Sequence, residues 1–341
     1  MTRPLRSQLY HSVALPLLDK SGLFSALRWV QRRSALILMY HNIVEVNGSN
    51  GNLTNQNQVT TTSFRWQLEF LREHYTVVPL VDIVERLKSS RSIERLAAIT
   101  FDDGYAGVYA NAEPILRAMG LPSTVFLIAG CIEDNAITWF DQVEALILNT
   151  SHRELTLGGV TYDLCGDRLE AVRAVKQRLK PLALDVRDAM IAELAENTDP
   201  LAPDRYAPYR LMGWKQIEEL RSQGMSFGVH TYTHPHLSRV PKEKLQFEVD
   251  HAAEVISERL SMPLRELVFC YPDGDYTEPI RDYIEESGML AAVAVDNSLA
   301  RPSTDLFAIP RIAVGRGFSP AAFSDATVGF TRGLKESLRT Q

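Results

Sequence analysis

The stretch that decides the fold is Leu96-Ala97-Ala98-Ile99-Thr100-Phe101-Asp102-Asp103-Gly104. Its apolar beginning is typical of a buried strand, and two carboxylates follow where the strand gives way to a loop. Folds that alternate strands and helices carry their functional groups at the carboxyl ends of the strands. The stretch therefore predicts an α/β fold with Asp102 and Asp103 at its functional edge.

Short strand-like runs alternate with helical patterns over most of the chain. Besides the run at 97–101, we predict strands at 35–40, 76–78, 123–128, 226–229, 267–271 and 290–295. We also expect a helix from Phe64 to about His74, capped by Ser63, after a polar segment (45–62) that is either functional or mobile. This alternation is typical of a barrel of repeated strand and helix units.

One segment, 131–212, breaks the alternation. It contains a predicted helix at 139–148, a hairpin-like stretch at 155–162, and helical stretches at 168–180 and 184–197. We interpret it as a helical insertion beside the barrel mouth, with a packing decoration as the alternative. The predicted organisation is an N-terminal amphipathic helical segment (1–33), a barrel that contains the insertion (34–315) and a C-terminal helical tail (316–341).

A second polar group, His230-Thr231-Tyr232-Thr233-His234, follows later in the chain. Adjacent carboxylates repel each other unless a positive charge lies near, and two imidazoles are natural ligands of a divalent transition metal. Two histidines and one carboxylate leave coordination positions open, as a catalytic metal requires, although iron oxygenases use the same set. Alone, the first motif is commonly a turn and the second a solvated helix face; together they predict a metal site.

Both motifs resemble the polysaccharide deacetylases of carbohydrate esterase family four, the NodB-homology family, whose signatures are Thr-Phe-Asp-Asp-Gly and His-Thr-x-x-His. A third segment, Phe269 to Tyr276, is similar to the Tyr-Pro-x-Gly stretch of the branch that acts on exopolysaccharides such as poly-N-acetylglucosamine. The resemblance spans about residues 34 to 315. It implies a distorted (β/α)7 TIM-like barrel that removes N-acetyl groups from N-acetylhexosamine units of a polysaccharide or oligosaccharide, in exopolysaccharide or cell-surface polysaccharide biosynthesis.

The resemblance also implies the roles of the site residues. Asp103, His230 and His234 would bind one divalent transition metal, zinc in the first place, with nickel, cobalt or iron as alternatives. Asp102 would then be the general base. Exchange of the two aspartate roles is chemically possible, so their order rests on the resemblance alone. The helical insertion of this branch implies a surface that shapes polymer binding.

The general acid is expected to differ from that of many family members. In those proteins a histidine in a Leu-x-His motif near the C-terminus serves as the acid. No histidine follows His251 in this chain. His41 ends the first predicted strand, and the poly-N-acetylglucosamine branch is similar in placing its acid histidine in an N-terminal Tyr-His. We expect His41 to be the acid, with a structural or substrate-contacting role as the alternative.

A second departure concerns the arginine that many members place before the proline of the third motif, where it pairs with the base. Cys270 and Tyr271 occupy that region. Arg311, on a neighbouring strand, is the candidate to replace it. A buried arginine would lower the pKa of Asp102 and orient its carboxylate. The alternative is a structural or surface ion pair.

Three residues of the third motif are expected to bind substrate. In this interpretation Tyr271, Asp273 and Gly274 line the site, and a backbone N–H near Tyr271 helps to hold the oxyanion, as in the family. Trp214 is expected in the core, and His236 outside the metal site.

The composition limits the partners. The chain has 341 residues, of which 45% are hydrophobic and 23% charged, and a formal net charge of -6. Without a basic run, this balance argues against nucleic acid and favours a neutral substrate, here an acetylated amino-sugar polymer or oligosaccharide. Three widely separated cysteines predict neither a disulfide framework nor a CxxC metal site.

The N-terminal segment bears on localisation. Charged residues interrupt it, so it lacks the apolar core of a signal peptide or spanning helix, and we expect a cytoplasmic protein. Its apolar residues nevertheless recur near helical spacing and precede Arg32 and Arg33. Packing of this helix on the barrel and peripheral contact with the inner face of the membrane both remain open.

Two other functions are compatible with the fold. One is an amidohydrolase acting on a small cyclic amide, which usually accompanies degraded metal motifs. The other is a non-catalytic carbohydrate-binding relative, which would be expected to lose Asp102 or a metal ligand. Both motifs are complete, and this favours the deacetylase.

Overall fold

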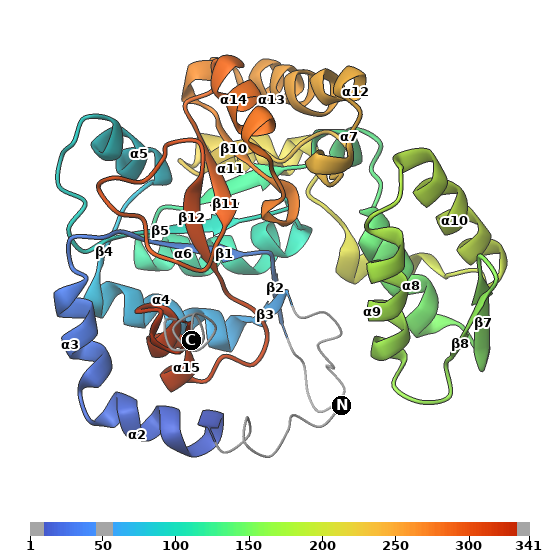
Figure 1. Ribbon diagram of the computed structural model, residues 1–341, viewed down its shortest axis with the longest axis horizontal. Coiled ribbons are helices and arrows are strands. Elements are labelled where there is room, and N and C mark those ends of the chain that lie inside the picture. Colours follow the sequence, from blue (N-terminus) through green and yellow to red (C-terminus); the bar gives the residue numbers. More distant parts are fainter. Residues whose placement is uncertain (1–9, 46–56, 333–341) are drawn as a thin grey trace.

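Seven parallel strands close into a barrel in this computed structural model, which describes residues 10–45 and 57–332 (Figure 1). The strands follow one another around the barrel in chain order, and the last pairs with the first. Their bounds are β1 (Leu36–Tyr40), β5 (Leu96–Phe101), β6 (Thr124–Leu127), β9 (Ser226–Val229), β10 (Val268–Cys270), β11 (Ala291–Val295) and β12 (Ile309–Ala313). The predicted seven-stranded barrel is confirmed. The first nine residues, 46–56 of the predicted polar segment and 333–341 of the predicted tail lie outside the described residues.

Two strands differ from the sequence pattern. The strand predicted at 76–78 is present as β4 (Thr76–Val77), but it pairs only with the first residues of β5 and lies outside the closed ring. β12 completes the ring although it contains Pro310 and Arg311, neither of which is typical of a buried strand. The apolar pattern alone therefore did not mark it as a strand.

Side chains alternate between the inside and the outside of the barrel wall. Along β5, alternate residues beginning with Ala97 pack outward against the helices in the main apolar core. Ala98 faces inward and belongs, with Phe126 of β6, to the core that fills the barrel. Thr100 and Asp102 continue this inward series, so β5 delivers polar groups to the carboxyl end of the barrel interior.

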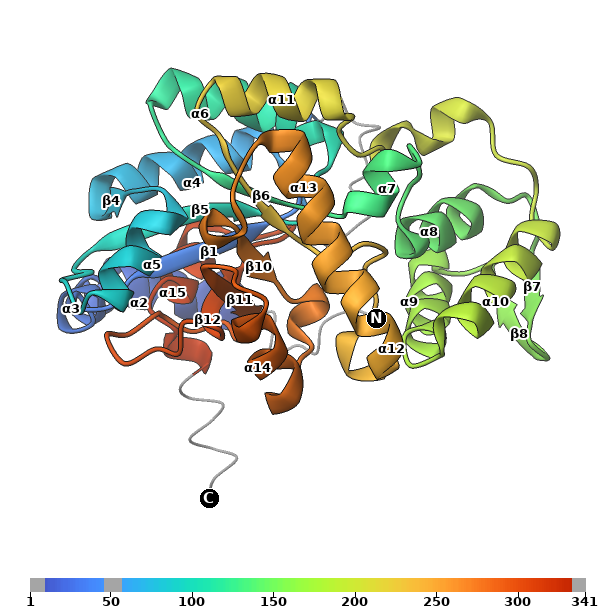
Figure 2. The ribbon, with the colours of Figure 1, turned by 90° about the horizontal axis from the view of Figure 1, so that it is seen from above.

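Helices surround the barrel (Figure 2). Their bounds are α4 (Thr61–His74), α5 (Leu80–Lys88), α6 (Glu113–Met119), α7 (Ala129–Glu133), α11 (Trp214–Ser222), α12 (Lys242–Gln246), α13 (Ala252–Leu260) and α14 (Glu278–Glu286). Of these helices, α5 packs its apolar side chains into the core that fills the barrel. The predicted cap of α4 is wrong: Thr60 Oγ1, not Ser63, caps the helix and accepts the Ser63 backbone N–H at 3.0 Å. The helix begins earlier because Thr60 ends β3 (Gln58–Thr60), which pairs with β2 (Asn42–Val44).

Most of the segment 131–212 forms a lobe beside the barrel, which both views show to one side (Figure 1, Figure 2). The predicted helices and hairpin are present as α8 (Trp139–Asn149), β7 (Glu154–Leu157), β8 (Val160–Asp163), α9 (Arg168–Leu179) and α10 (Leu184–Glu196). Their apolar faces enclose a small core that is separate from the barrel core. The lobe is therefore more than a surface loop.

The two N-terminal helices pack on the C-terminal helix; their bounds are α2 (Leu15–Lys20), α3 (Leu23–Val30) and α15 (Pro320–Ala326). Leu15 and Phe24 are fully buried in this contact, whereas Leu17 and Trp29 are exposed. Packing thus accounts for part of the apolar pattern, and contact with a membrane stays a prediction. Within the two described stretches of the chain, no helix is both long and apolar enough to cross a bilayer.

Candidate active site

Arg311 and Asp102 form an ion pair inside the carboxyl end of the barrel. Arg311 is fully buried, and its two terminal nitrogens donate to the two carboxylate oxygens of Asp102 at 2.6 and 2.8 Å. Thr100 Oγ1 accepts a further hydrogen bond from the guanidinium at 3.0 Å, and the guanidinium lies over the ring of Phe126. The two parallel hydrogen bonds fix the orientation of the carboxylate. The structure thus pairs Arg311 with Asp102 as the sequence predicted.

The ion pair also sets the charge of Asp102. Burial alone would raise the pKa of this carboxyl, but the charge and hydrogen bonds of Arg311 outweigh burial and hold the pKa well below its ordinary range. Asp102 is therefore ionised at neutral pH.

We predict that Arg311→Met destabilises the fold by about 3–5 kcal/mol, because it leaves the Asp102 carboxylate buried without a partner. Urea unfolding followed by circular dichroism measures this loss. The double variant Asp102→Asn/Arg311→Met, which removes both charges, should recover part of it. A loss below about 1 kcal/mol in the single variant would mean that the pair contributes no more than an exposed ion pair does.

Asp103, His230 and His234 converge at the carboxyl ends of β5 and β9. The Nε2 atoms of both histidines lie 3.5 Å from Asp103 Oδ1, and all three residues are buried. His230 Nδ1 lies 2.8 Å from the carbonyl oxygen of Cys270. Because that oxygen can only accept, Nδ1 carries the proton and Nε2 presents its lone pair to the centre of the triad.

The groups of this triad fit a divalent cation. Asp103 Oδ1 is buried and has no hydrogen-bond partner among the described residues. Burial raises the pKa of Asp103 well above its ordinary value, and the charge of Asp102 adds to the rise. Burial lowers the pKa of His234 to about 3, so its imidazole is neutral at neutral pH. Ionising this buried carboxylate without a nearby cation is costly. A transition metal bound by the carboxylate and the two neutral imidazoles would stabilise the ionised form.

The backbone of the triad is held in an uncommon conformation. Asp103, Thr231 and His234 have φ angles of 69°, 63° and 57°, in the left-handed region that a β-branched residue such as Thr231 rarely adopts. Glu248 supports the loop: its buried carboxylate accepts hydrogen bonds from the backbone N–H groups of Tyr232 and Thr233 at 3.1 and 2.9 Å. Surrounding contacts of this kind are what retain such conformations at functional sites. Glu248 carried no signal in the sequence, because it lies outside every motif.

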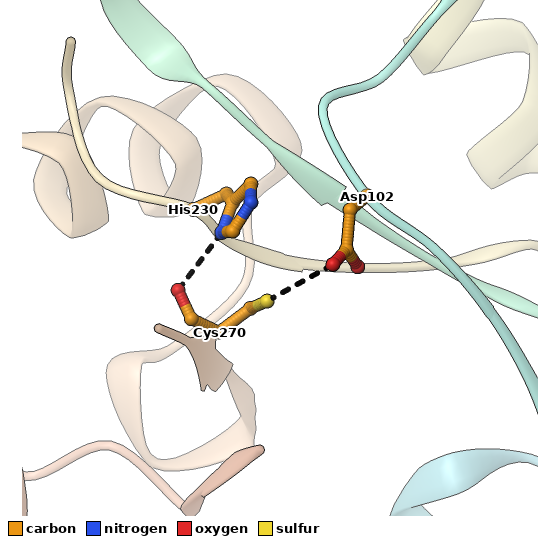
Figure 3. Close-up of side chains that lie close together, drawn as sticks. All are labelled: Asp102, His230 and Cys270. Carbon is orange, nitrogen blue, oxygen red and sulfur yellow. Dashed lines mark hydrogen bonds between the residues drawn. The ribbon is translucent and has the colours of Figure 1, made fainter. Parts of the chain in front are cut away.

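A second set of donors, Asp102, His230 and Cys270, also lies close together (Figure 3). Cys270 Sγ is 3.6 Å from Asp102 Oδ2, but Arg311 donates to that same oxygen and lies 3.0 Å from the sulfur. Burial raises the pKa of the Cys270 thiol well above its ordinary value, so the thiolate that a metal requires is disfavoured. The guanidinium charge makes this set a poor cation site and leaves Asp102 beside the Asp103 triad rather than within it.

A cavity of about 280 Å³ opens onto the triad. The barrel contributes His41, Asp102 and Asp273 besides the triad itself, and the insertion contributes Trp139, Phe140, Lys176 and Lys180. The sequence did not indicate the two lysines, because lysines on a helix are commonly solvated. The packing of α9 beside the barrel brings them to the site.

His41 follows the last residue of β1 and lines the cavity. Burial lowers its pKa to about 4, although the charge of Asp102 acts in the opposite direction. Its Nδ1 is buried without a hydrogen-bond partner in the described part of the chain. An unpartnered imidazole close to the Asp102 charge suits a group that exchanges a proton with a substrate.

The structure removes Tyr271 from the predicted substrate contacts. Its side chain is fully buried and donates its hydroxyl to the carbonyl oxygen of Phe307 at 2.9 Å. Its backbone N–H donates to the carbonyl oxygen of Val293 at 3.2 Å, so it is not available for an oxyanion. The cause is the alternation along β10: Cys270 faces the barrel interior, and Tyr271 therefore faces the helices.

Asp273 does line the cavity, and two side chains hold it. Lys180 Nζ lies 3.1 Å from Oδ1 and His236 Nε2 lies 2.8 Å from Oδ2, so the insertion and the loop after the triad meet at this carboxylate. Gly274 has a φ of 69°, and a Cβ there would lie 2.9 Å from the backbone nitrogen of Val295. Gly274 therefore allows the loop that carries Asp273 to approach β11, and a contact of Gly274 with substrate stays a prediction.

Comparison with known families agrees with this geometry. The family model described as polysaccharide deacetylase matches residues 89–292, more than half of the chain. The chain therefore belongs to the polysaccharide deacetylase family, and it is a hydrolase of carbon–nitrogen bonds other than peptide bonds. The matched range contains Asp102 and the triad, but it leaves out His41 and Arg311.

Individual relatives are distant. YxkH of Bacillus subtilis is 21% identical over 289 residues, which are 84% of this chain and 74% of YxkH. The poly-beta-1,6-N-acetyl-D-glucosamine N-deacetylase of Staphylococcus aureus is 23% identical over 210 residues, which are 58% of this chain and 72% of that enzyme. The solved structure of Streptococcus pyogenes deacetylase PplD has a TM-score of 0.57 at 18% identity and covers 86% of this chain and 98% of PplD. The similarity to PplD shows that the two proteins share a fold.

Proposed function

We propose that this protein removes N-acetyl groups from N-acetylhexosamine units of a polysaccharide or oligosaccharide, with one divalent metal, zinc, held by Asp103, His230 and His234. One observation carries the proposal: a single cavity combines this triad with an arginine-held carboxylate and an unpartnered histidine. Similarity to the Staphylococcus aureus deacetylase supports the sugar. A role in exopolysaccharide or cell-surface polysaccharide biosynthesis belongs to the same proposal and rests on the resemblance of the motifs. A cytoplasmic location, at or near the inner face of the membrane, is part of the same proposal.

Each residue then has one task in amide hydrolysis. A divalent metal would supply a Lewis acid for the acetyl oxygen and lower the pKa of a bound water. Asp102, ionised and oriented by Arg311, accepts a proton from the attacking water. Arg311 holds the pKa of Asp102 well below its ordinary value, so the carboxylate is ionised and can accept this proton. His41 lines the same cavity, where it would take up that proton and donate it to the departing amine.

The cavity suits an uncharged sugar. The Lys180 ammonium and the Asp273 carboxylate offset each other at its rim, and both can exchange hydrogen bonds with hydroxyl groups. Trp139 and Phe140 add apolar surface on the side of the insertion. A few polar groups among apolar ones is the usual composition of a small-molecule subsite.

Release of free amine from a panel of substrates tests the proposal. Zinc-loaded protein is expected to release amine from N-acetylglucosamine oligomers and to leave a small cyclic amide intact. The reverse preference would favour the amidohydrolase, and binding of the oligomer without any release would favour the carbohydrate-binding relative.

We predict that His41→Ala loses most deacetylation of sugar amides but keeps its metal and much of its substrate affinity. The departing amine needs a proton, whereas the leaving group of an activated acetyl ester does not, so ester hydrolysis should be spared. Turnover is measured on the sugar amide and on the activated ester, together with metal content. The ratio of amide turnover to ester turnover should fall in His41→Ala relative to the parent.

His152→Ala is the matched control, because His152 lies in the insertion with a side chain that is 49% exposed. It should leave both turnovers unchanged. Equal losses on amide and ester in His41→Ala would show that His41 is a structural or binding residue.

A further inference from the structure

The start of α8, in the helical insertion, lies directly against the candidate metal site. The ring of Phe140 meets the ring of His234 at a centroid distance of 5.0 Å and an interplanar angle of 63°. Phe140 and its neighbour Trp139 also line the cavity. The insertion thus contacts a predicted metal ligand and does more than stand beside the barrel.

Asp141, the next residue, is a buried carboxylate of this helix. It is fully buried, and its Oδ2 accepts hydrogen bonds from Tyr105 at 2.6 Å and from Thr138 at 2.9 Å. Its Oδ1 is buried without a hydrogen-bond partner among the described residues. Burying a carboxylate costs free energy unless it is paired, and Lys176, whose charge acts on Asp141, forms its ion pair with Glu144 instead.

Tyr105 joins this carboxylate to the metal site. It is buried, lies two residues after Asp103 on the same loop, and donates its hydroxyl to Asp141 Oδ2. This hydrogen bond ties the loop that carries Asp103 to the insertion. Groups outside the coordination shell that hold the metal ligands in place orient those ligands and tune the affinity for the metal.

We propose that Asp141 is a positioning residue of the metal site: it holds the Tyr105 hydroxyl and thereby fixes the loop that places Asp103 for the cation. The helical insertion is then required for full metal affinity. This inference rests on the proposed function for the existence of the metal. It adds to that function a role for the insertion that lies outside the family motifs.

A helix cap is the competing explanation for Asp141. Thr138 is the N-cap of α8, and its hydroxyl accepts the Asp141 backbone N–H at 3.4 Å while donating to the Asp141 carboxylate. Loss of a cap lowers stability but does not by itself change the metal ligands. The two roles therefore separate when metal affinity and stability are measured on the same variants.

Zinc affinity, measured by competition with a fluorescent chelator, and the apo melting temperature test the proposal. Tyr105→Phe and Asp141→Ala should each weaken zinc binding about 10- to 100-fold. The double variant should bind zinc no more weakly than the worse single variant, because both changes break the same hydrogen bond. Thr138→Val, which breaks only the cap, should lower the melting temperature and keep the zinc affinity within about threefold of the parent.

Tyr209→Phe is a matched control, because this buried tyrosine donates its hydroxyl to Glu144 of the same helix at 3.4 Å. It should bind zinc like the parent. Unchanged zinc affinity in Tyr105→Phe and Asp141→Ala, with lower melting temperatures, would overturn the proposal in favour of a cap. A parent protein that binds no zinc would instead contradict the proposed function.

Discussion

Asp102→Asn is expected to lower turnover on an acetylated oligosaccharide by about two to four orders of magnitude, as loss of a general base does. Asparagine keeps the shape of the side chain but cannot accept a proton from water. The triad of Asp103, His230 and His234 is untouched, so the variant should retain its metal. Steady-state release of amine, with metal content measured on the same sample, gives the result.

Asp102→Asn also leaves the Arg311 guanidinium buried without its counter-ion, and this loss of stability must be separated from the loss of chemistry. Melting temperatures of Asp102→Asn and of the double variant Asp102→Asn/Arg311→Met provide the separation. Both should be folded at the assay temperature and equally inactive. Activity near that of the parent in either variant would remove Asp102 from the mechanism, and loss of metal in Asp102→Asn would reverse the roles of the two aspartates.

Asp103→Ala and His230→Ala are expected to take metal content from about one ion per chain to none after dialysis, and to abolish turnover. Each removes one of three ligands from a site that already leaves positions open for water and substrate. Elemental analysis of the dialysed proteins measures the change. His236→Ala is the matched control, because its imidazole contacts Asp273 and not the triad, and it should keep the metal. Full metal content in Asp103→Ala would show that the ligands have been assigned wrongly.

Much of the site was predictable because parallel strands of a barrel end at one edge. The motif after β5 and the motif after β9 each follow an apolar run, so their side chains had to meet once the barrel closed. The same reasoning placed His41 at the end of β1 and in the same cavity. Arg311 was harder to place, since β12 carries a proline and a buried charge and so lacks the apolar pattern of the other strands.

Tyr271 shows what the motif alone leaves out. The motif fixes the order of the residues, but the side-chain alternation of β10 decides which of two neighbours faces the interior. Cys270 contacts Asp102 and Arg311 inside the barrel, and Tyr271 is thereby turned to the opposite face. To predict which residue faces the interior, one would have needed the register of β10 against β9. These two strands share one residue pair, so the sequence gives little information on that register.

The sequence predicted an insertion beside the barrel mouth, but not which of its residues reach the site. Its helices and hairpin could be recognised from their periodicity, but the direction in which the lobe packs depends on contacts between segments far apart in the chain. Asp141 bonds to Tyr105 across 36 residues, and Lys180 meets a carboxylate of the third motif. Neither residue belongs to a motif, and a polar residue on a helix is ordinarily solvated.

The most direct test of the central claim, metal-dependent N-deacetylation at the Asp103 triad, is the mass of the product formed from an N-acetylglucosamine oligomer. The parent protein is expected to remove acetyl groups with release of an equal amount of acetate. Stripping with a chelator should stop the reaction, zinc should restore it, and Asp103→Ala should stay inactive with or without zinc. Undiminished deacetylation by the stripped protein, or by Asp103→Ala, would contradict the claim.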